Sequence, residues 1–159
     1  MKTKTKTLLF VGVIMSFLSY GQDDKIINKI DKQIKDINSQ SFKVNLITNK
    51  DDLLLLSKTD KCVSLIMCTE KDNGKDIMIF NFGDTTRVET YYNLKDGLIG
   101  LEEEIITFGA KSTSLKYYFD AGQLYKAIDG KGRNKTTEVN TKELYDRIKR
   151  YYHEGWIIK

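Results

Sequence analysis

Residues 62–82 read CVSLIMCTEKDNGKDIMIFNF, and their pattern is the strongest indication of the fold. Two apolar runs, Cys62–Thr69 and Asp76–Phe82, flank the turn sequence Lys71-Asp72-Asn73-Gly74. Asn-Gly is the strongest short hairpin signal, because both residues tolerate a positive φ. Successive side chains of a strand point to opposite faces of its sheet, and each run would place apolar residues on both faces. We therefore expect two paired strands in the centre of a sheet, with both faces covered.

The flanking sequence predicts more strands of the same kind. Residues 42–47, FKVNLI, alternate as a half-buried strand does, whereas residues 49–59, with the leucine run 53–56, fit either a short helix or a strand. Two further hairpins are predicted from segments on either side of Asp- and Gly-containing turns: Arg87–Leu94 with Leu98–Phe108, and Thr113–Phe119 with Gln123–Asp129. Short turns between consecutive strands predict an antiparallel meander of about six to seven strands.

A helix is expected at each end of this meander. Residues 24–38 place isoleucine at helical spacing, at positions 26, 27, 30, 34 and 37. Residues 141–153 place Leu144 and Ile148 on one face, and Asn140 stands three residues before Glu143, close to a capping box. The sequence thus predicts an α+β fold, in which the N-terminal amphipathic helix packs on the antiparallel sheet and a second helix ends the chain.

The first 21 residues predict export. Lys2, Lys4 and Lys6 precede the apolar run 8–18, and Ser19 and Gly21 are small residues before Gln22. A basic head, a short apolar middle and a small-x-small exit form a secretory signal peptide. We expect cleavage after Gly21, a secreted or periplasmic location, and one α+β domain over residues 22–159. The alternative is an uncleaved membrane anchor, which an 11-residue apolar run is too short to form as a spanning helix.

Charge and cysteine content limit the partners. The chain has 26 basic and 22 acidic residues, and three of the basic residues lie in the leader, so the remainder carries a net charge of +1. Such a chain has no field that would attract nucleic acid or an anionic membrane.

An exported protein can form a disulfide, but Cys62 and Cys68 on one strand would lie too far apart, and we favour two buried thiols over a bridge.

Catalytic groups are scarce. The single histidine, His153, is placed near the end of the last helix, and no nucleophile motif or nucleotide-binding motif accompanies it. Glu102 and Glu104 are the best carboxylate pair, and we interpret them as a solvated strand end paired with lysine on a neighbouring strand. We expect no enzyme activity, no cofactor and no metal site.

Tyrosines form the remaining signal. Tyr91, Tyr118 and Tyr125 fall in the alternating sets that contain the more polar residues of their strands, so we expect them on one exposed sheet face as a binding surface. The alternative is that cross-strand tyrosines simply stabilise the sheet.

The sequence therefore predicts a small exported binding or accessory protein without catalysis, whose partner is a protein, a peptide or an envelope component. It expects no nucleic-acid partner and no membrane partner after cleavage. An inhibitor or immunity-type protein is a narrower form of the same hypothesis. A small hydrolase using Glu102, Glu104 or His153 is the competing one.

Overall fold

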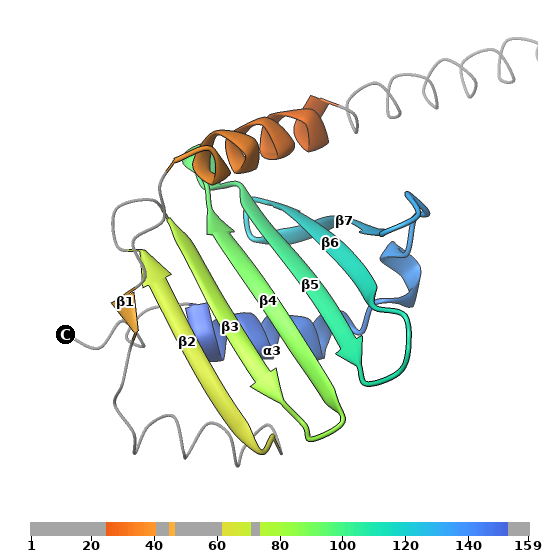
Figure 1. The fold of residues 1–159 in the computed structure, drawn as a ribbon. Helices are drawn as coiled ribbons and strands as arrows, with labels where there is room; N and C mark the ends of the chain where they lie inside the picture. Colours follow the sequence, from red (N-terminus) through yellow and green to blue (C-terminus); the bar gives the residue numbers. More distant parts are fainter. Residues whose placement is uncertain (1–24, 41–44, 47–61, 71–73, 153–159) are drawn as a thin grey trace, which may run out of the picture.

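The computed structural model describes residues 25–40, 45–46, 62–70 and 74–152. Its seven strands form one sheet in the order β1-β2-β3-β4-β5-β6-β7, and every neighbouring pair is antiparallel (Figure 1). The strands are β1 Asn45–Leu46, β2 Ser64–Glu70, β3 Lys75–Asn81, β4 Thr85–Asn93, β5 Ile99–Thr107, β6 Thr113–Asp120 and β7 Gln123–Asp129. The predicted meander of six to seven strands is confirmed.

Turn chemistry sets the first full hairpin. Gly74 follows β2 with a φ of 64°, a conformation that favours glycine. A Cβ at this position would come within 2.5 Å of the Asn93 carbonyl oxygen, so the space also requires glycine. Gly74 therefore fixes where β3 begins, and β2 and β3 pair from Ser64↔Asn81 to Glu70↔Lys75.

The two helices lie on opposite faces of the sheet, as Figure 1 shows. Residues 25–38 form the N-terminal helix, and α3 spans Thr141–Tyr152. Two reciprocal contacts cap the start of α3. The Asn140 side chain accepts a hydrogen bond from the Glu143 backbone N–H and donates one to the Glu143 carboxylate, both at 3.3 Å. The α+β fold with a helix at each end is thus confirmed.

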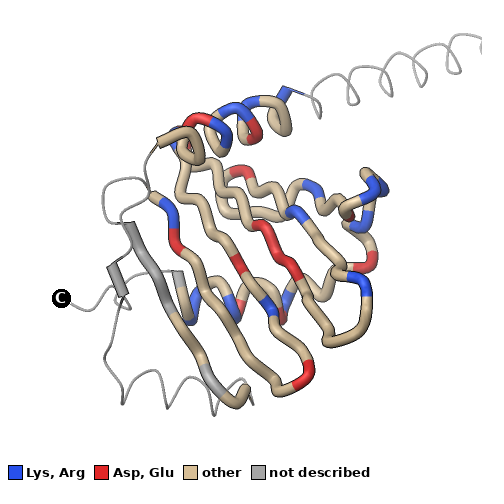
Figure 2. The backbone as a smooth tube through the Cα atoms, in the orientation of Figure 1, with Lys and Arg blue, Asp and Glu red and all other residues tan. Residues whose placement is uncertain are grey.

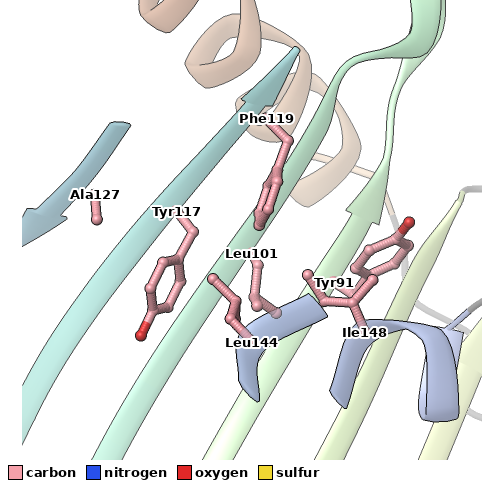
Figure 3. Packing of buried hydrophobic residues seen from close by; sticks show 7 residues of the cluster. All are labelled: Tyr91, Leu101, Tyr117, Phe119, Ala127, Leu144 and Ile148. Atoms are coloured by element: carbon pink, nitrogen blue, oxygen red, sulfur yellow. The ribbon is translucent and has the colours of Figure 1, made fainter. Parts of the chain in front are cut away.

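Helix α3 covers one face along most of its length. Leu144 and Ile148 pack against side chains from β4 to β7, which Figure 3 shows: Tyr91, Leu101, Tyr117, Phe119 and Ala127. Near the C-terminal end of α3, Tyr151 joins a second buried cluster with Cys62, Leu65, Met78 and Phe80. We refer to this side of the sheet as the α3 face.

The N-terminal helix covers only one end of the opposite face. Ile30 and Ile34 pack there against Tyr92, Leu94, Leu98 and Tyr118. Gly100 of β5 lies directly beneath, and a Cβ on it would come within 2.6 Å of the Ile34 Cδ1 atom. The absence of a side chain at Gly100 therefore lets the helix approach the sheet closely.

The expectation that both faces of β2 are covered is wrong, whereas β3 lies between β2 and β4 as a central strand. Within the described ranges, β1 is the one strand between β2 and the edge of the sheet. Ile66 of β2 points away from the α3 face and is 42% exposed, because the N-terminal helix does not reach it. The apolar pattern of β2 therefore does not mean that both of its faces are buried: Leu65 is buried, whereas Ile66 is partly exposed.

Several sequence-based predictions concern residues outside the described ranges. The leader, the leucine run 53–56, His153 and the apolar residues 156–158 all belong to this group. Cys62 is buried just before β2, and Cys68 belongs to β2 itself, but the side chain of Cys68 is not described. The preference for two buried thiols stays a prediction.

The far edge of the sheet is closed by the chain that follows β7. The Ala127 backbone N–H donates to Thr136 Oγ1 at 2.9 Å, and the Ala127 carbonyl accepts from the Lys135 N–H at 2.8 Å. The Leu124 N–H donates to the Tyr145 hydroxyl at 2.6 Å. These bonds occupy backbone groups to which another strand would otherwise pair. Partner binding by strand addition at β7 is therefore disfavoured.

Candidate functional site

The predicted tyrosine surface is not formed. Tyr91 is 3% exposed on the α3 face, whereas Tyr118 is 4% exposed on the opposite face beneath the N-terminal helix. Tyr125 is half-buried on β7. The expectation that the three share one exposed face is wrong, and Tyr91 and Tyr118 serve as core residues. The alternative, that tyrosines stabilise the sheet, accounts for both of them.

The error has a clear physical origin. Tyr91 alternates along β4 with Arg87 and Glu89, two charged residues that suggest a solvent-facing set. In the structure this set faces α3, and Glu89 is fully buried. A charged set can lie inside because α3 supplies the opposite charge at the same place.

Four charged side chains meet between the sheet and α3. We call Arg87, Glu89, Glu103 and Arg147 the buried charge cluster. Arg147 Nε lies 2.7 Å from Glu89 Oε1, and Arg147 Nη2 lies 2.8 Å from Glu103 Oε2. Arg87 Nε lies 3.0 Å from Glu89 Oε1. Glu89 and Glu103 are paired across β4 and β5, so the Arg147 guanidinium contacts both neighbouring carboxylates, and Arg87 supplies the second positive charge.

This cluster resembles catalytic chemistry only in its residue types. Both carboxylates are buried and held by guanidinium groups, and the Tyr117 hydroxyl donates a further hydrogen bond to Glu103 Oε1 at 3.2 Å. A cavity of about 310 Å³ adjoins Glu103 and Arg147 near the start of α3. Since each charge is already matched, the cluster acts as a clamp between α3 and the sheet.

A sequence signal for Arg147 exists. Leu144, Ile148 and Tyr151 form the buried stripe of α3, and Arg147 lies within that stripe at helical spacing. A charged residue inside an apolar stripe requires a buried counterion. The position of Arg147 could therefore have predicted buried carboxylates on the strands that α3 covers.

Burial also raises the pKa values of four tyrosine side chains. It raises the pKa of Tyr91 and of Tyr92 to about 12, and it raises the pKa values of Tyr117 and Tyr118 above their usual range. The hydroxyl groups of Tyr92, Tyr117 and Tyr118 contact carboxylate or amide groups, such as Tyr118 with Asp31 at 3.1 Å. These phenols are therefore protonated hydrogen-bond donors at neutral pH.

The raised values predict alkaline instability. Tyrosines in the unfolded chain ionise near pH 10.0, whereas the buried ones stay protonated, so unfolding releases protons above that pH. The stability from these groups is complete below pH 10.0 and is lost as the pH rises toward about 12. Urea unfolding across this range, followed with tyrosinate absorbance, should show the decline. Tyr92→Phe should show a shallower one, and constant stability across the range would contradict the prediction.

The part of the sheet that no described helix covers is the strongest candidate site. We define the open face as the side chains that point away from α3 beyond the reach of the N-terminal helix: Ile66, Ile77, Ile79, Val88, Thr90, Glu102, Glu104, Ile106, Ser114 and Lys116. Strand register places Ile66, Ile79, Val88, Glu104 and Ser114 side by side in one row. The face therefore changes from apolar over β2–β4 to acidic on β5.

The acidic half lines a cavity of about 480 Å³ together with Val88, Thr90 and Ser114. Lys116 Nζ lies 2.8 Å from Glu102 Oε1, which confirms the predicted pairing of the acidic run with lysine on a neighbouring strand. The Tyr92 hydroxyl donates to Glu102 Oε2 at 3.3 Å. Glu104 is exposed and is in no ion pair within the described part of the chain. Figure 2 shows the acidic residues of β5 in the middle of the sheet.

Glu102 and Glu104 thus share a face, but nothing described places a third catalytic group with them. His153 lies outside the described ranges. Among the described residues, no group of histidine, cysteine and carboxylate side chains could hold a metal ion. No helix within those residues is long and apolar enough to cross a bilayer.

Comparisons with known proteins assign neither a family nor a function to this chain. No protein-family model, curated protein or solved structure matches this chain at a significant level. The function must therefore be argued from the open face itself.

Proposed function

We propose that the protein is an exported, non-catalytic binding protein that holds a protein or peptide partner on its open face. The observation that carries the proposal is the row of partly exposed aliphatic side chains beside an acidic strip. Ile66 and Ile106 are 42% and 44% exposed, although neighbouring side chains on the α3 face are buried. An apolar surface of this kind on a sheet is typical of a binding site.

Three further features support the proposal. The leader pattern of residues 1–21 predicts export. The carboxylates most buried in the sheet are neutralised within the buried charge cluster, so they stabilise the fold. Hydrogen bonds close the β7 edge, which favours the face of the sheet over that edge.

Site-specific photo-crosslinking in the native host tests the proposal. A benzoylphenylalanine residue at Ile106 or Ser114 should yield one crosslinked partner species, because both positions border the open face and are exposed. The same probe at Asp146, an exposed position of α3, serves as the control. Adding Val88→Asn, which removes the apolar contact without adding charge, should abolish the crosslink from Ser114. Equal crosslinking from the open face and from Asp146 would overturn the proposal.

A further inference from the structure

The open face also specifies the chemistry of its partner. Resting on the proposed function, we infer that the segment bound there is cationic and amphipathic: lysine or arginine side chains next to apolar ones, supplied by another protein. The inference concerns charge and side-chain type at the site already described. Its evidence is the arrangement of Val88, Glu104, Glu102 and Lys116.

Register brings the apolar and acidic halves into direct contact. Val88 on β4 pairs with Glu104 on β5, and the next pair on this face is Thr90 with Glu102. Directly opposed residues on adjacent strands have Cβ atoms about 5 Å apart. A lysine or arginine side chain can therefore lie with its methylene stem along Val88 while its charged group reaches Glu104.

The two carboxylates are not equivalent. Glu102 already contacts Lys116 and the Tyr92 hydroxyl, so much of its charge is matched. Glu104 is exposed, and no ion pair within the described ranges neutralises it. An incoming cation would meet Glu104 first. Among the described side chains of the open face, the half-exposed Lys116 would repel it, but Lys116 is paired with Glu102. An acidic partner would instead place its charges against Glu104.

The apolar half sets the second requirement. Ile66, Ile79 and Val88 form a continuous aliphatic row next to Glu104, and Ile106 lies one row further along β5. A purely polar cation would leave this row exposed to water, whereas an amphipathic segment covers it and gains the burial energy. The combination of both halves therefore favours a segment that carries both kinds of side chain.

Peptide binding to the full chain tests the inference. The probes are two fluorescein-labelled peptides of about 18 residues, long enough to be helical. Both have the same leucine face, and they carry either lysine or glutamate on the polar face. We expect the lysine peptide to bind at least tenfold more tightly than the glutamate peptide. Glu104→Gln should weaken the lysine peptide about two- to fivefold, the value of an exposed ion pair.

Charge reversal and a matched control sharpen the test. Glu104→Lys should weaken the lysine peptide further and improve binding of the glutamate peptide. Asp146→Asn removes one exposed carboxylate from α3 and should leave both affinities unchanged. Raised salt should weaken wild-type binding more than binding to Glu104→Gln.

The outcomes separate this inference from the proposed function. Equal affinity for the two peptides, lost in Val88→Asn, would overturn the cationic preference and leave binding at the open face intact. Lysine-peptide binding that is unchanged in both Glu104→Gln and Val88→Asn would place the peptide elsewhere and overturn the inference. If sedimentation shows a dimer that Val88→Asn dissociates, a second copy is the occupant, and the inferred partner is wrong.

Discussion

Arg147→Leu is expected to lower the free energy of unfolding by about 3–5 kcal/mol, the usual cost of breaking a buried ion pair from one side. The substitution leaves Glu103 without its guanidinium partner and leaves Glu89 with Arg87 alone. Both carboxylates are buried and adjacent across β4 and β5, so their repulsion adds to the cost of burial. Urea unfolding monitored by circular dichroism measures the change.

A matched variant and a double variant test the cause. Lys149→Leu changes an exposed cation of the same helix and should alter stability by no more than about 0.5 kcal/mol. Glu103→Leu combined with Arg147→Leu removes one carboxylate with its partner and keeps the Arg87–Glu89 pair. The double variant should therefore be more stable than Arg147→Leu alone. Similar losses for Lys149→Leu and Arg147→Leu would show that the buried charge cluster does not clamp α3.

Phe80→Ala is the second substitution with a large expected effect, about 3–5 kcal/mol. Phe80 is completely buried on β3, and its ring meets the Tyr151 ring edge-to-face with a centroid separation of 5.1 Å. The Arg87 guanidinium lies 4.2 Å from the Phe80 centroid on the ring face. Removing the ring creates a cavity where α3 meets β3, and it also removes the surface on which Arg87 is stacked.

The chain provides its own control for this substitution. Phe108 is 92% exposed after β5, so Phe108→Ala deletes the same atoms without opening a cavity. Its stability should change by no more than about 0.5 kcal/mol. Hydrogen exchange of the α3 amides should accelerate in Phe80→Ala and stay unchanged in Phe108→Ala. Equal losses in the two variants would mean that the contact between β3 and α3 contributes little.

Hairpins and helix termini were predictable because their determinants are local. The Asn-Gly turn at Gly74 uses a positive φ, and the Asn140–Glu143 cap depends on two residues three positions apart. The ion pair between Glu102 and Lys116 also followed, since β5 and β6 are consecutive strands joined by a short turn. Each of these features involves residues close in sequence or on adjoining strands.

The sides of the sheet could not be assigned in the same way. Alternation divides β4 into two sets, but it does not say which set a helix covers. Tyr91, Arg87 and Glu89 formed the set expected in water, and α3 buries them by bringing Arg147 from a distant part of the sequence. The candidate site changed accordingly, from three tyrosines to the open face.

The hairpins, the two helices and the leader pattern follow from the sequence, because turn residues, hydrophobic periodicity and charge spacing act over a few residues. The strand order comes from the tertiary structure. The tertiary structure also sets which charges lie inside and which apolar residues stay exposed. Those properties depend on where the N-terminal helix and α3 end on the sheet. The N-terminal helix reaches Tyr92 and Tyr118 but not Ile66 or Glu104, and this limit of its reach creates the open face.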